Sequence, residues 1–378
     1  MEIPKNLQNL KICLVTDWLT NLGGGEKVVH AIADIFPKAQ IYVTVADFEA
    51  VSSDFPDKKR IKTSYLQRLP VLHKKHQLLL PLLSHGIESH DLSGYDLILS
   101  FSSCVAKNAG LKRSGKHVCY IHTPVRYGWE MEYDPRVKNL PKLIQPIAKI
   151  FLKRLKNHDY DLRKNPDLYI SNSSETNSRV RKFYDLSAKT LYPPVDIKNL
   201  KFSDKKSDYF LGFGRMVVYK KFDLLVDAFL GMPDKKLILA GIGPETERLK
   251  EKVKKSGAKN ITFAGKVSDS KKKDLFAKAR ALMLPQKEDA GIVQLEAMAS
   301  GTPVVAYKSG GVLDVLEENI NGVFFEKQTV AGIISGIDKF EKQESKFDAE
   351  KIRKTAEKFS TENFQKNYLE ILEKFMTK

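Results

Sequence analysis

Short runs of β-branched and aliphatic residues recur along the chain, and each is followed by a Gly- or Ser-bearing turn and a stretch of helical periodicity. In the first half the runs are residues 11–17, 40–46, 96–102, 117–122 and 167–171. A second series comprises residues 209–214, 236–241, 261–265, 281–285, 303–307 and 322–325. Alternation of this kind predicts parallel sheets covered by helices. The expected fold class is α/β, with two Rossmann-like doubly wound domains in tandem.

The boundary between the two series lies near residue 200. Pro193 and Pro194 form a stiff connector because their φ angles are fixed, and the polar stretch 198–208 follows. We expect an N-terminal domain at residues 1–200 and a C-terminal domain at residues 201–355. A last helix, residues 356–378, carries one apolar face and is expected to cross back to the N-terminal domain; that face contains Phe364, Tyr368, Ile371, Leu372 and Phe375.

The composition argues against a membrane-spanning or secreted protein. The longest aliphatic run, residues 78–83, contains Pro81 and is far shorter than the roughly 20 apolar residues of a membrane-spanning helix. The first residues lack the charged-then-apolar layout of a secretory signal, and the cysteines lie inside apolar runs at Cys13, Cys104 and Cys119. We therefore expect a reduced, cytoplasmic enzyme or binding protein.

The charge is strongly basic. Lys and Arg number 63 and Asp and Glu number 46, so the formal net charge is +17. Such a charge favours phosphate-rich partners, and nucleic acid, anionic lipid headgroups and nucleotide-like small molecules all qualify. Solvated surface lysine accounts for the same excess without a partner.

One basic segment, residues 135–164, has nine basic and two acidic side chains. Ile147, Ile150, Phe151 and Leu155 recur there at helical spacing. A basic amphipathic helix can lie on an anionic membrane, which would place the protein on the inner face of the membrane, but a solvated face over a core gives the same pattern. Residues 66–83 are a second candidate on the same terms.

A glycine triplet, residues 23–25, stands between the first predicted strand and the helical run 26–36. Glycines and the amides of a helix start favour a bound anion at this point. The dinucleotide-binding fingerprint is nevertheless absent, because its third glycine is replaced at all three candidate positions, by Val28, Val217 and Thr246. Hydride transfer with a nicotinamide cofactor is disfavoured, and there is no Walker pattern.

Basic residues follow the first strand of the second series. Arg215 comes directly after the run 209–214, and Lys220 and Lys221 precede the helical run 222–229. A planar bidentate donor and an ammonium at the carboxyl end of a parallel strand suit a diphosphate. Surface lysines beside an unrelated arginine are the alternative.

Two acids follow the buried run 281–285. Glu288 is expected in a loop, and Glu296 about two helical turns along the next helix. The amides of residues 290–293 begin that helix. Carboxylates accept hydrogen bonds from sugar hydroxyls, whereas helix-start amides favour phosphate oxygens. Acids and amides together therefore predict a sugar-nucleotide site.

These motifs resemble the retaining glycosyltransferases of family 4, which have the GT-B fold of two Rossmann-like domains facing a cleft. The resemblance covers nearly the whole chain and rests on residues 215–220, the turn 241–244, the acid pair Glu288 and Glu296, residues 301–305, and Gly310-Gly311. Residues 120–129, 172–173 and 192–195 are similar to the subgroup of mannosyltransferases in bacterial surface-polysaccharide assembly.

The resemblance implies a role for each matching residue. Arg215 and Lys220, assisted by Lys221, grip the donor diphosphate. Glu288 faces the transferred sugar, Glu296 holds the ribose, and His122 lies near the donor sugar. Further positions on the donor side are Gly24, Gly25, Gly214, Gly291, Ile292 and Val293, and those proposed on the acceptor side are Arg126 and Tyr127.

The resemblance also implies the reaction: a hexose, most simply mannose from GDP-mannose, passes with retention to a glycan or a polyprenyl-diphosphate-linked acceptor. Ala290 stands where the family commonly has Phe, so the donor class is better determined than the sugar. Fixed cations can offset the leaving-group charge, and we expect neither cofactor nor metal. The sequence Asp159-Tyr160-Asp161 spells the two-acid motif of metal-dependent transferases, but no strand precedes it, and we attribute it to chance.

Two other functions remain open. A sugar-nucleotide epimerase or a phosphorylase would keep the same fold with a different reaction. A nucleic-acid-binding protein would use the positive charge, but aromatic residues that could stack on bases do not interleave with the basic run. We therefore expect no nucleic-acid partner.

Overall fold

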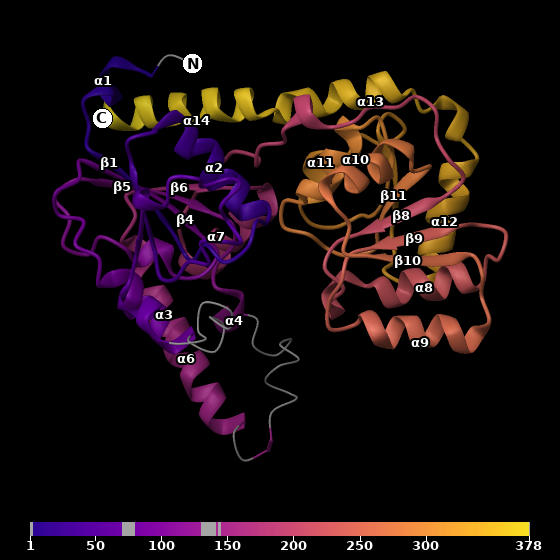
Figure 1. Ribbon diagram of the computed structural model, residues 1–378, viewed down its shortest axis with the longest axis horizontal. Helices are drawn as coiled ribbons and strands as arrows, with labels where there is room; N and C mark the ends of the chain where they lie inside the picture. Colours follow the sequence, from indigo (N-terminus) through magenta and orange to yellow (C-terminus); the bar gives the residue numbers. More distant parts are fainter. Residues whose placement is uncertain (1–2, 70–79, 130–140, 143–144, 378) are drawn as a thin grey trace. The chain divides into compact units, whose positions relative to one another are not determined.

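The computed structural model describes residues 3–69, 80–129, 141–142 and 145–377, apart from the side chains of residues 80, 81 and 127. The chain forms two compact units, which are drawn in Figure 1. The N-terminal unit comprises Met1–Pro194 and Phe364–Lys378, and the C-terminal unit comprises Val195–Asn363.

A seven-stranded parallel sheet forms the centre of the N-terminal unit, with strand order β3-β2-β1-β4-β5-β6-β7. The strands are β1 Ile12–Thr16, β2 Gln40–Val43, β3 Ile61–Thr63, β4 Leu97–Ser102, β5 Lys116–Ile121, β6 Leu168–Ser171 and β7 Lys189–Thr190. Every residue of β1 and β4 is buried, as expected where helices cover both faces of a parallel sheet. Strands β3 and β7 were not predicted from the sequence, because they are short edge strands with exposed residues and no apolar run.

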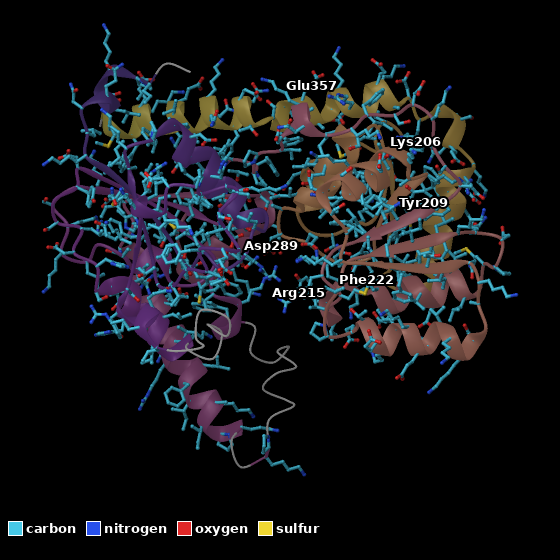
Figure 2. All side chains as sticks on the ribbon, in the orientation of Figure 1. Lys206, Tyr209, Arg215, Phe222, Asp289 and Glu357 are labelled. Atoms are coloured by element: carbon cyan, nitrogen blue, oxygen red, sulfur yellow. The ribbon has the colours of Figure 1, made fainter. Side chains whose placement is uncertain are left out.

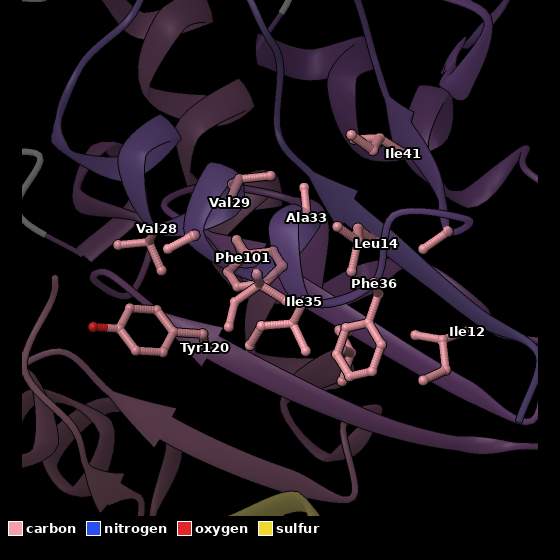
Figure 3. Close-up of a cluster of buried hydrophobic side chains, with 14 of the residues drawn as sticks. Ile12, Leu14, Val28, Val29, Ala33, Ile35, Phe36, Ile41, Phe101 and Tyr120 are labelled. Atoms are coloured by element: carbon pink, nitrogen blue, oxygen red, sulfur yellow. The ribbon is translucent and has the colours of Figure 1, made fainter. Parts of the chain in front are cut away.

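Helices cover this sheet and bury its apolar face. They are α1 Lys5–Gln8, α2 Gly24–Ile35, α3 Leu80–Glu88, α4 Arg126–Trp129, α6 Gln145–Asp161, α7 Ser174–Tyr184 and α14 Thr361–Met376. Figure 3 shows Val29 and Ala33 of α2 in one cluster with Leu14 and Phe101 of the sheet. Burying a side chain of this size contributes roughly 1.5–3 kcal/mol. Phe364 and other apolar residues of α14 join the same cluster, so the end of the chain completes the N-terminal core.

The C-terminal unit has a six-stranded parallel sheet with strand order β10-β9-β8-β11-β12-β13. Its strands are β8 Phe210–Phe213, β9 Leu237–Ala240, β10 Ile261–Gly265, β11 Ala281–Leu284, β12 Val304–Tyr307 and β13 Gly322–Phe325. Its helices are α8 Phe222–Leu230, α9 Thr246–Ser256, α10 Asp269–Lys278, α11 Ile292–Ala299, α12 Val330–Glu341 and α13 Ala349–Ala356. The prediction of two doubly wound α/β units is confirmed.

Short polar side chains fix where several helices begin. The Ser173 hydroxyl accepts a hydrogen bond from the Thr176 amide at the start of α7, and Thr329 does the same for α12. Such caps satisfy amides that have no partner within the helix. Asp185 ends α7 in the left-handed conformation.

Both sheets reverse their strand order at an equivalent place. In the N-terminal unit the chain moves outward from β1 through β2 to β3 and then returns to place β4 on the other side of β1. In the C-terminal unit β8 and β11 have the same relation. Open α/β sheets bind ligands at the carboxyl ends of the strands where this reversal occurs. The two switch points are therefore the first places to look for a site.

Candidate functional site

The loop after β8 in the C-terminal unit is held backbone against backbone on the loop after β9. A Cβ at Gly241, which has φ 129°, would lie 1.9 Å from the carbonyl oxygen of Gly214. Only glycine permits this approach. The Met216 amide also donates to the Ile242 carbonyl at 3.2 Å. These contacts fix the backbone on both sides of Arg215, whose side chain is exposed.

Two predicted residues meet at the switch point between β8 and β11. Lys220 ends the 3₁₀ turn Val218–Lys220, and Lys221, with φ 54°, directly precedes α8. The Lys220 ammonium forms an ion pair with the carboxylate of Glu288, and their side chains are 12% and 17% exposed. The structure therefore places a mostly buried cation and anion where the sequence analysis expected a diphosphate and a sugar.

Gln286 contacts the same carboxylate oxygen of Glu288 as Lys220 does. Its Nε2 donates to Glu288 Oε1 at 2.9 Å. Gln286 Oε1 is buried and has no hydrogen-bond partner among the residues that the structure describes. Gln286 was not predicted as a site residue, although its position between a buried strand and an acidic loop is a signal that the sequence contains.

The loop after β12 supports the loop that carries Glu288. The Gly311 amide donates to the Glu288 carbonyl at 2.8 Å, and a Cβ at Gly311 would lie 1.8 Å from the carbonyl oxygen of Asp289. Figure 2 shows Asp289 and Arg215 on the same side of the C-terminal unit, whereas Tyr209 lies at the beginning of β8. The Gly-Gly pair thus has a physical role, because it lets two loops of the site pack without side chains between them.

Helix α11 begins directly after this loop. Gly291, with φ 68°, is its N-cap, and Ile292 and Val293 are its first two residues. The next residue, Gln294, is fully buried; its Nε2 donates to the Ala290 carbonyl at 3.2 Å, and within the described ranges its buried Oε1 lacks a partner. The helix start therefore lies beside the acidic loop, as the sequence analysis predicted.

Glu296 differs from its predicted position. Because α11 begins at Ile292, Glu296 lies little more than one turn into the helix, and the expectation of two turns was wrong. Its carboxylate is 2.7 Å from the ammonium of Lys272 on α10, and its side chain is only 6% exposed. Lys272 was missed because it stands in a run of three lysines, where nothing distinguishes it from solvated neighbours.

His122 and Gly25 lie together in the N-terminal unit. His122 directly follows β5, and a Cβ at Gly25, the second residue of α2, would be 3.5 Å from His122 Nε2. The His122 carbonyl accepts hydrogen bonds from Asn172 Nδ2 and Thr176 Oγ1, both at 3.1 Å. The first residue of α4 is Arg126, and the side chain of Tyr127 lies outside the described residues.

The switch point of the N-terminal unit is filled by a carboxylate of the chain itself. Asp17, at the end of β1, is 4% exposed, and burial raises its pKa. Its two oxygens accept backbone hydrogen bonds of 2.6–3.0 Å from four consecutive residues after β4: Ser103, Cys104, Val105 and Ala106. Nearby, the Gly23 amide donates to Glu26 Oε2 at 3.0 Å, and burial also raises the pKa of Glu26. The sequence analysis missed both acids.

A second buried carboxylate ties together the surroundings of α4. Asp159 of α6 accepts hydrogen bonds from Trp129 Nε1 at 2.7 Å and the Tyr184 hydroxyl at 2.8 Å. Its Oδ1 is 3.2 Å from Lys107 Nζ, and both side chains are 1% exposed. The acid pair at 159 and 161 therefore includes a structural anchor.

The two basic segments of the sequence analysis are only partly described. Of residues 135–164, residues 135–140 and 143–144 lie outside the described residues, and of residues 66–83, residues 70–79 do so. Every helix within the described ranges is too short or too polar to cross a membrane. Over the same ranges, no cluster of three or more His, Cys, Asp or Glu side chains is arranged to hold a metal ion.

The architecture defines a class: two Rossmann-like units, as in GT-B glycosyltransferases. Anabaena Alr3699/HepE, solved in complex with UDP and glucose, superimposes with a TM-score of 0.72 at 20% identity, covering 97% of this chain and 100% of the other. Residues 196–359 match the family model "Glycosyl transferases group 1", which is almost the whole C-terminal unit.

Sequence relatives carry related descriptions. An uncharacterized glycosyltransferase of Methanocaldococcus jannaschii is 31% identical over 141 residues, 36% of each chain. A GDP-mannose-dependent alpha-(1-6)-phosphatidylinositol monomannoside mannosyltransferase of Mycobacterium tuberculosis is 26% identical over 219 residues, 51% of this chain and 55% of that protein. The matched segments thus span between about a third and about half of these relatives.

Proposed function

We propose that this protein is a retaining glycosyltransferase of family 4 that transfers a hexose, mannose from GDP-mannose in the first instance, to a glycan or lipid-linked acceptor in surface-polysaccharide assembly. In this proposal the donor domain is residues 201–355 and the acceptor-side domain is residues 1–200. The observation that carries it is the ion pair between Lys220 and Glu288 at the switch point of the unit that matches the glycosyltransferase model.

The chemistry follows from the charges at that point. Departure of a nucleoside diphosphate leaves negative charge on its oxygens, and a fixed cation stabilises that charge in the transition state more than in the bound donor. Lys220 has a mostly buried ammonium for this purpose, and Arg215 adds an exposed guanidinium on the same loop. With two fixed cations and the amides of α11, the proposed transfer needs no metal ion.

Acid groups would orient the sugar and the ribose. Glu288 is held by Lys220 and Gln286, and when the ammonium turns to a diphosphate, the carboxylate becomes available to sugar hydroxyls. Glu296 beside Lys272 is the proposed ribose partner, and His122 beside Gly25 the proposed contact to the donor sugar. Arg126 and Tyr127 remain proposals for the acceptor side. A lipid-linked acceptor agrees with a peripheral location at the inner face of a membrane.

The comparisons support two donors. The mycobacterial relative is named for GDP-mannose, whereas HepE has been solved with UDP-glucose. We place GDP-mannose first because residues 120–129 and 192–195 resemble the mannosyltransferase subgroup. UDP-glucose is the second candidate.

The test is transfer from a panel of nucleotide sugars by the wild type and by Lys220→Ala and Glu288→Ala. Removing one group that stabilises the developing charge typically costs about 10²–10³-fold in rate, and we expect a loss of that size in kcat/KM for Lys220→Ala. Lys236→Ala is the matched control, because Lys236 is an exposed, ion-paired lysine at the start of β9, away from the carboxyl ends of the strands. Unchanged transfer by both site variants would refute the site.

Product analysis separates the alternatives. Conversion of the nucleotide sugar without any acceptor would indicate an epimerase, and dependence on inorganic phosphate would indicate a phosphorylase. Proton NMR of the anomeric centre of the product tests retention. Full activity in excess EDTA is expected, and loss of activity that Mg²⁺ or Mn²⁺ restores would contradict the metal-independent proposal.

A further inference from the structure

Helix α6 of the N-terminal unit exposes an apolar stripe. Ile147 and Ile150 are each 54% exposed and Phe151 is 44% exposed. At 100° per residue these three positions fall within about 100° of one another, and the stripe borders the side of the helix on which Leu155, about 40° from Phe151, is buried. An apolar stripe turned outward on a helix that already buries another face marks an interaction site rather than part of the core.

Basic side chains border this stripe. Lys149 and Lys153 lie on the adjoining side of the helix, and Arg154 lies within the stripe itself, one turn beyond Ile150. All three are exposed. The acids of α6 do not offset them there, because Asp159 is buried in its network with Lys107 and Asp161 stands at the end of the helix.

Two other polar helices that the structure describes, α9 and α14, lack this combination. Helix α9 has four lysines, of which Lys250 and Lys252 pair with acids, and its apolar residues Leu249 and Val253 are buried, so it exposes no apolar stripe. Helix α14 buries its apolar face in the N-terminal core. Exposed apolar side chains beside a cluster of positive charge therefore distinguish α6 from α9 and α14.

We infer that α6 docks the protein on an anionic lipid bilayer, with Ile147, Ile150 and Phe151 entering the headgroup region and Lys149, Lys153 and Arg154 meeting lipid phosphates. The net charge of the chain favours a membrane over a second copy of the chain as the partner of this stripe. A second copy of this chain, at +17, would bring like charges together, whereas an anionic surface attracts them. Amphipathic helices with basic polar faces bind membranes through the sum of both contributions.

This surface extends the proposed function, because it places a lipid-linked acceptor near the N-terminal unit. Binding itself requires no transfer reaction. It can therefore be measured without donor or acceptor, and its failure would leave the proposed glycosyltransferase activity untouched.

The experiment is flotation of the full chain with large unilamellar vesicles of phosphatidylcholine alone or with about 30% phosphatidylglycerol. We expect flotation with the anionic vesicles and little with the neutral ones. Lys149→Gln/Lys153→Gln/Arg154→Gln should weaken binding on the order of 100-fold, because each basic residue near such a surface contributes about a fivefold factor. Ile147→Ser/Ile150→Ser/Phe151→Ser should abolish flotation while the fold is retained.

Matched variants control for charge and for exposed apolar area. Lys254→Gln/Lys255→Gln/Lys259→Gln removes three exposed charges from the C-terminal unit, and Leu111→Ser/Ile320→Ser removes exposed apolar side chains elsewhere. Both should float like the wild type. Equal loss in the charge control would mean that binding depends on net charge alone and would overturn the assignment to α6.

A spectroscopic measurement separates insertion from simple adsorption. Phe151→Trp should shift its emission to the blue on addition of anionic vesicles, and Leu111→Trp should not. Absence of a shift at residue 151 would overturn the inference. So would sedimentation in which the wild type is a dimer and the Ile147→Ser/Ile150→Ser/Phe151→Ser variant is a monomer, because a second copy of the chain would then cover the stripe.

Discussion

The ends of β1 and β8 are equivalent places in two sheets whose strand orders agree over six strands, but the residues that follow them carry opposite charge. After β1, Asp17 occupies a ring of four backbone amides, and Glu26 takes the Gly23 amide. After β8, Arg215 is exposed and Lys220 pairs with an acid from the neighbouring loop. An anionic ligand would meet buried carboxylates in the first case and cations in the second.

The two switch points are expected to contribute differently, the first to stability and the second to the proposed function. Backbone amides at a switch point can hold a phosphate, but in the N-terminal unit the protein's own carboxylate already uses them. The same topology therefore ends in an internally hydrogen-bonded edge in one unit and, under the proposed function, in a donor-binding edge in the other. Substitutions at the first edge should change the free energy of unfolding, and substitutions at the second should change transfer.

The largest effect on stability is expected at Lys107, in the buried network of the N-terminal unit. Lys107→Met leaves the Asp159 carboxylate without its cation at a position that is 1% exposed. Breaking a buried pair by removing one partner costs about 3–5 kcal/mol. Urea unfolding followed by tryptophan fluorescence measures this unit selectively, because both tryptophans of the chain, Trp18 and Trp129, lie in it.

Two variants control for the loss of a lysine at this position. Lys112→Met, an exposed lysine of the same unit, should change the free energy of unfolding by less than about 0.5 kcal/mol. Lys107→Met/Asp159→Leu should recover part of the loss, since no unpaired charge then remains. A double variant that is as unstable as Lys107→Met or worse would mean that packing, not charge pairing, holds the network.

A paired substitution at the two switch points tests the comparison directly. Asp17→Asn exchanges an oxygen that accepts amide hydrogens for an NH₂ group that cannot, and should cost about 2–3 kcal/mol of unfolding free energy. Glu288→Gln keeps the shape of the side chain and one accepting oxygen, and the Lys220 ammonium, which is 12% exposed and not fully buried, retains some contact with water, so the cost should be smaller, about 1 kcal/mol. Thermal or urea unfolding of the two variants side by side measures the difference, and equal costs would contradict the division into a structural and a functional edge.

Most strands of both sheets could be predicted from the sequence, because strands that are buried on both faces appear as continuous apolar runs. The prediction failed at β3 and β7, whose short exposed edges have no such run. In the site, Lys220 and Glu288 could be predicted because each follows a recognisable strand. Asp17 and Lys272 could not, because their importance comes from partners 86–89 and 24 positions away, which only the folded chain brings within hydrogen-bond distance.

Acid should act on the N-terminal unit through His117. Burial, followed by the charges of Arg113 and Lys107, lowers the pKa of His117 to about 3, and its Nε2 lies 2.7 Å from the Ser100 hydroxyl. Between pH 6.5 and 3 the unfolded chain binds the proton and the folded chain does not, so stability falls as the pH falls. The contribution is about 1.4 kcal/mol per pH unit, or about 2 kcal/mol between pH 6.5 and 5.

His117→Gln should remove this part of the acid response. The measurement is the free energy of unfolding by tryptophan fluorescence at pH 7 and pH 5 for both proteins. The loss on acidification should be about 2 kcal/mol smaller in the variant. Parallel losses in the two proteins would show that His117 is protonated in the folded state at pH 5.

Alkali should stabilise the C-terminal unit through Lys206, whereas acid destabilises the N-terminal unit. Burial lowers the pKa of Lys206 to about 8, and its ammonium donates to the Ala277 carbonyl and the Thr302 hydroxyl, both at 2.9 Å. Between pH 8 and the ordinary lysine value near 10.5 the unfolded chain holds the extra proton, so stability rises with pH by about 1.4 kcal/mol per unit. Lys206→Met lacks this response.

The test is urea unfolding followed by far-UV circular dichroism at pH 8 and pH 9. The free energy of unfolding of the wild type should rise by about 1 kcal/mol more than that of Lys206→Met, since the proton is only partly lost near the pKa. An unchanged difference between the two proteins would place the Lys206 pKa outside this window, and the lysine would then act only as a cation that joins α10 to the loop before β12.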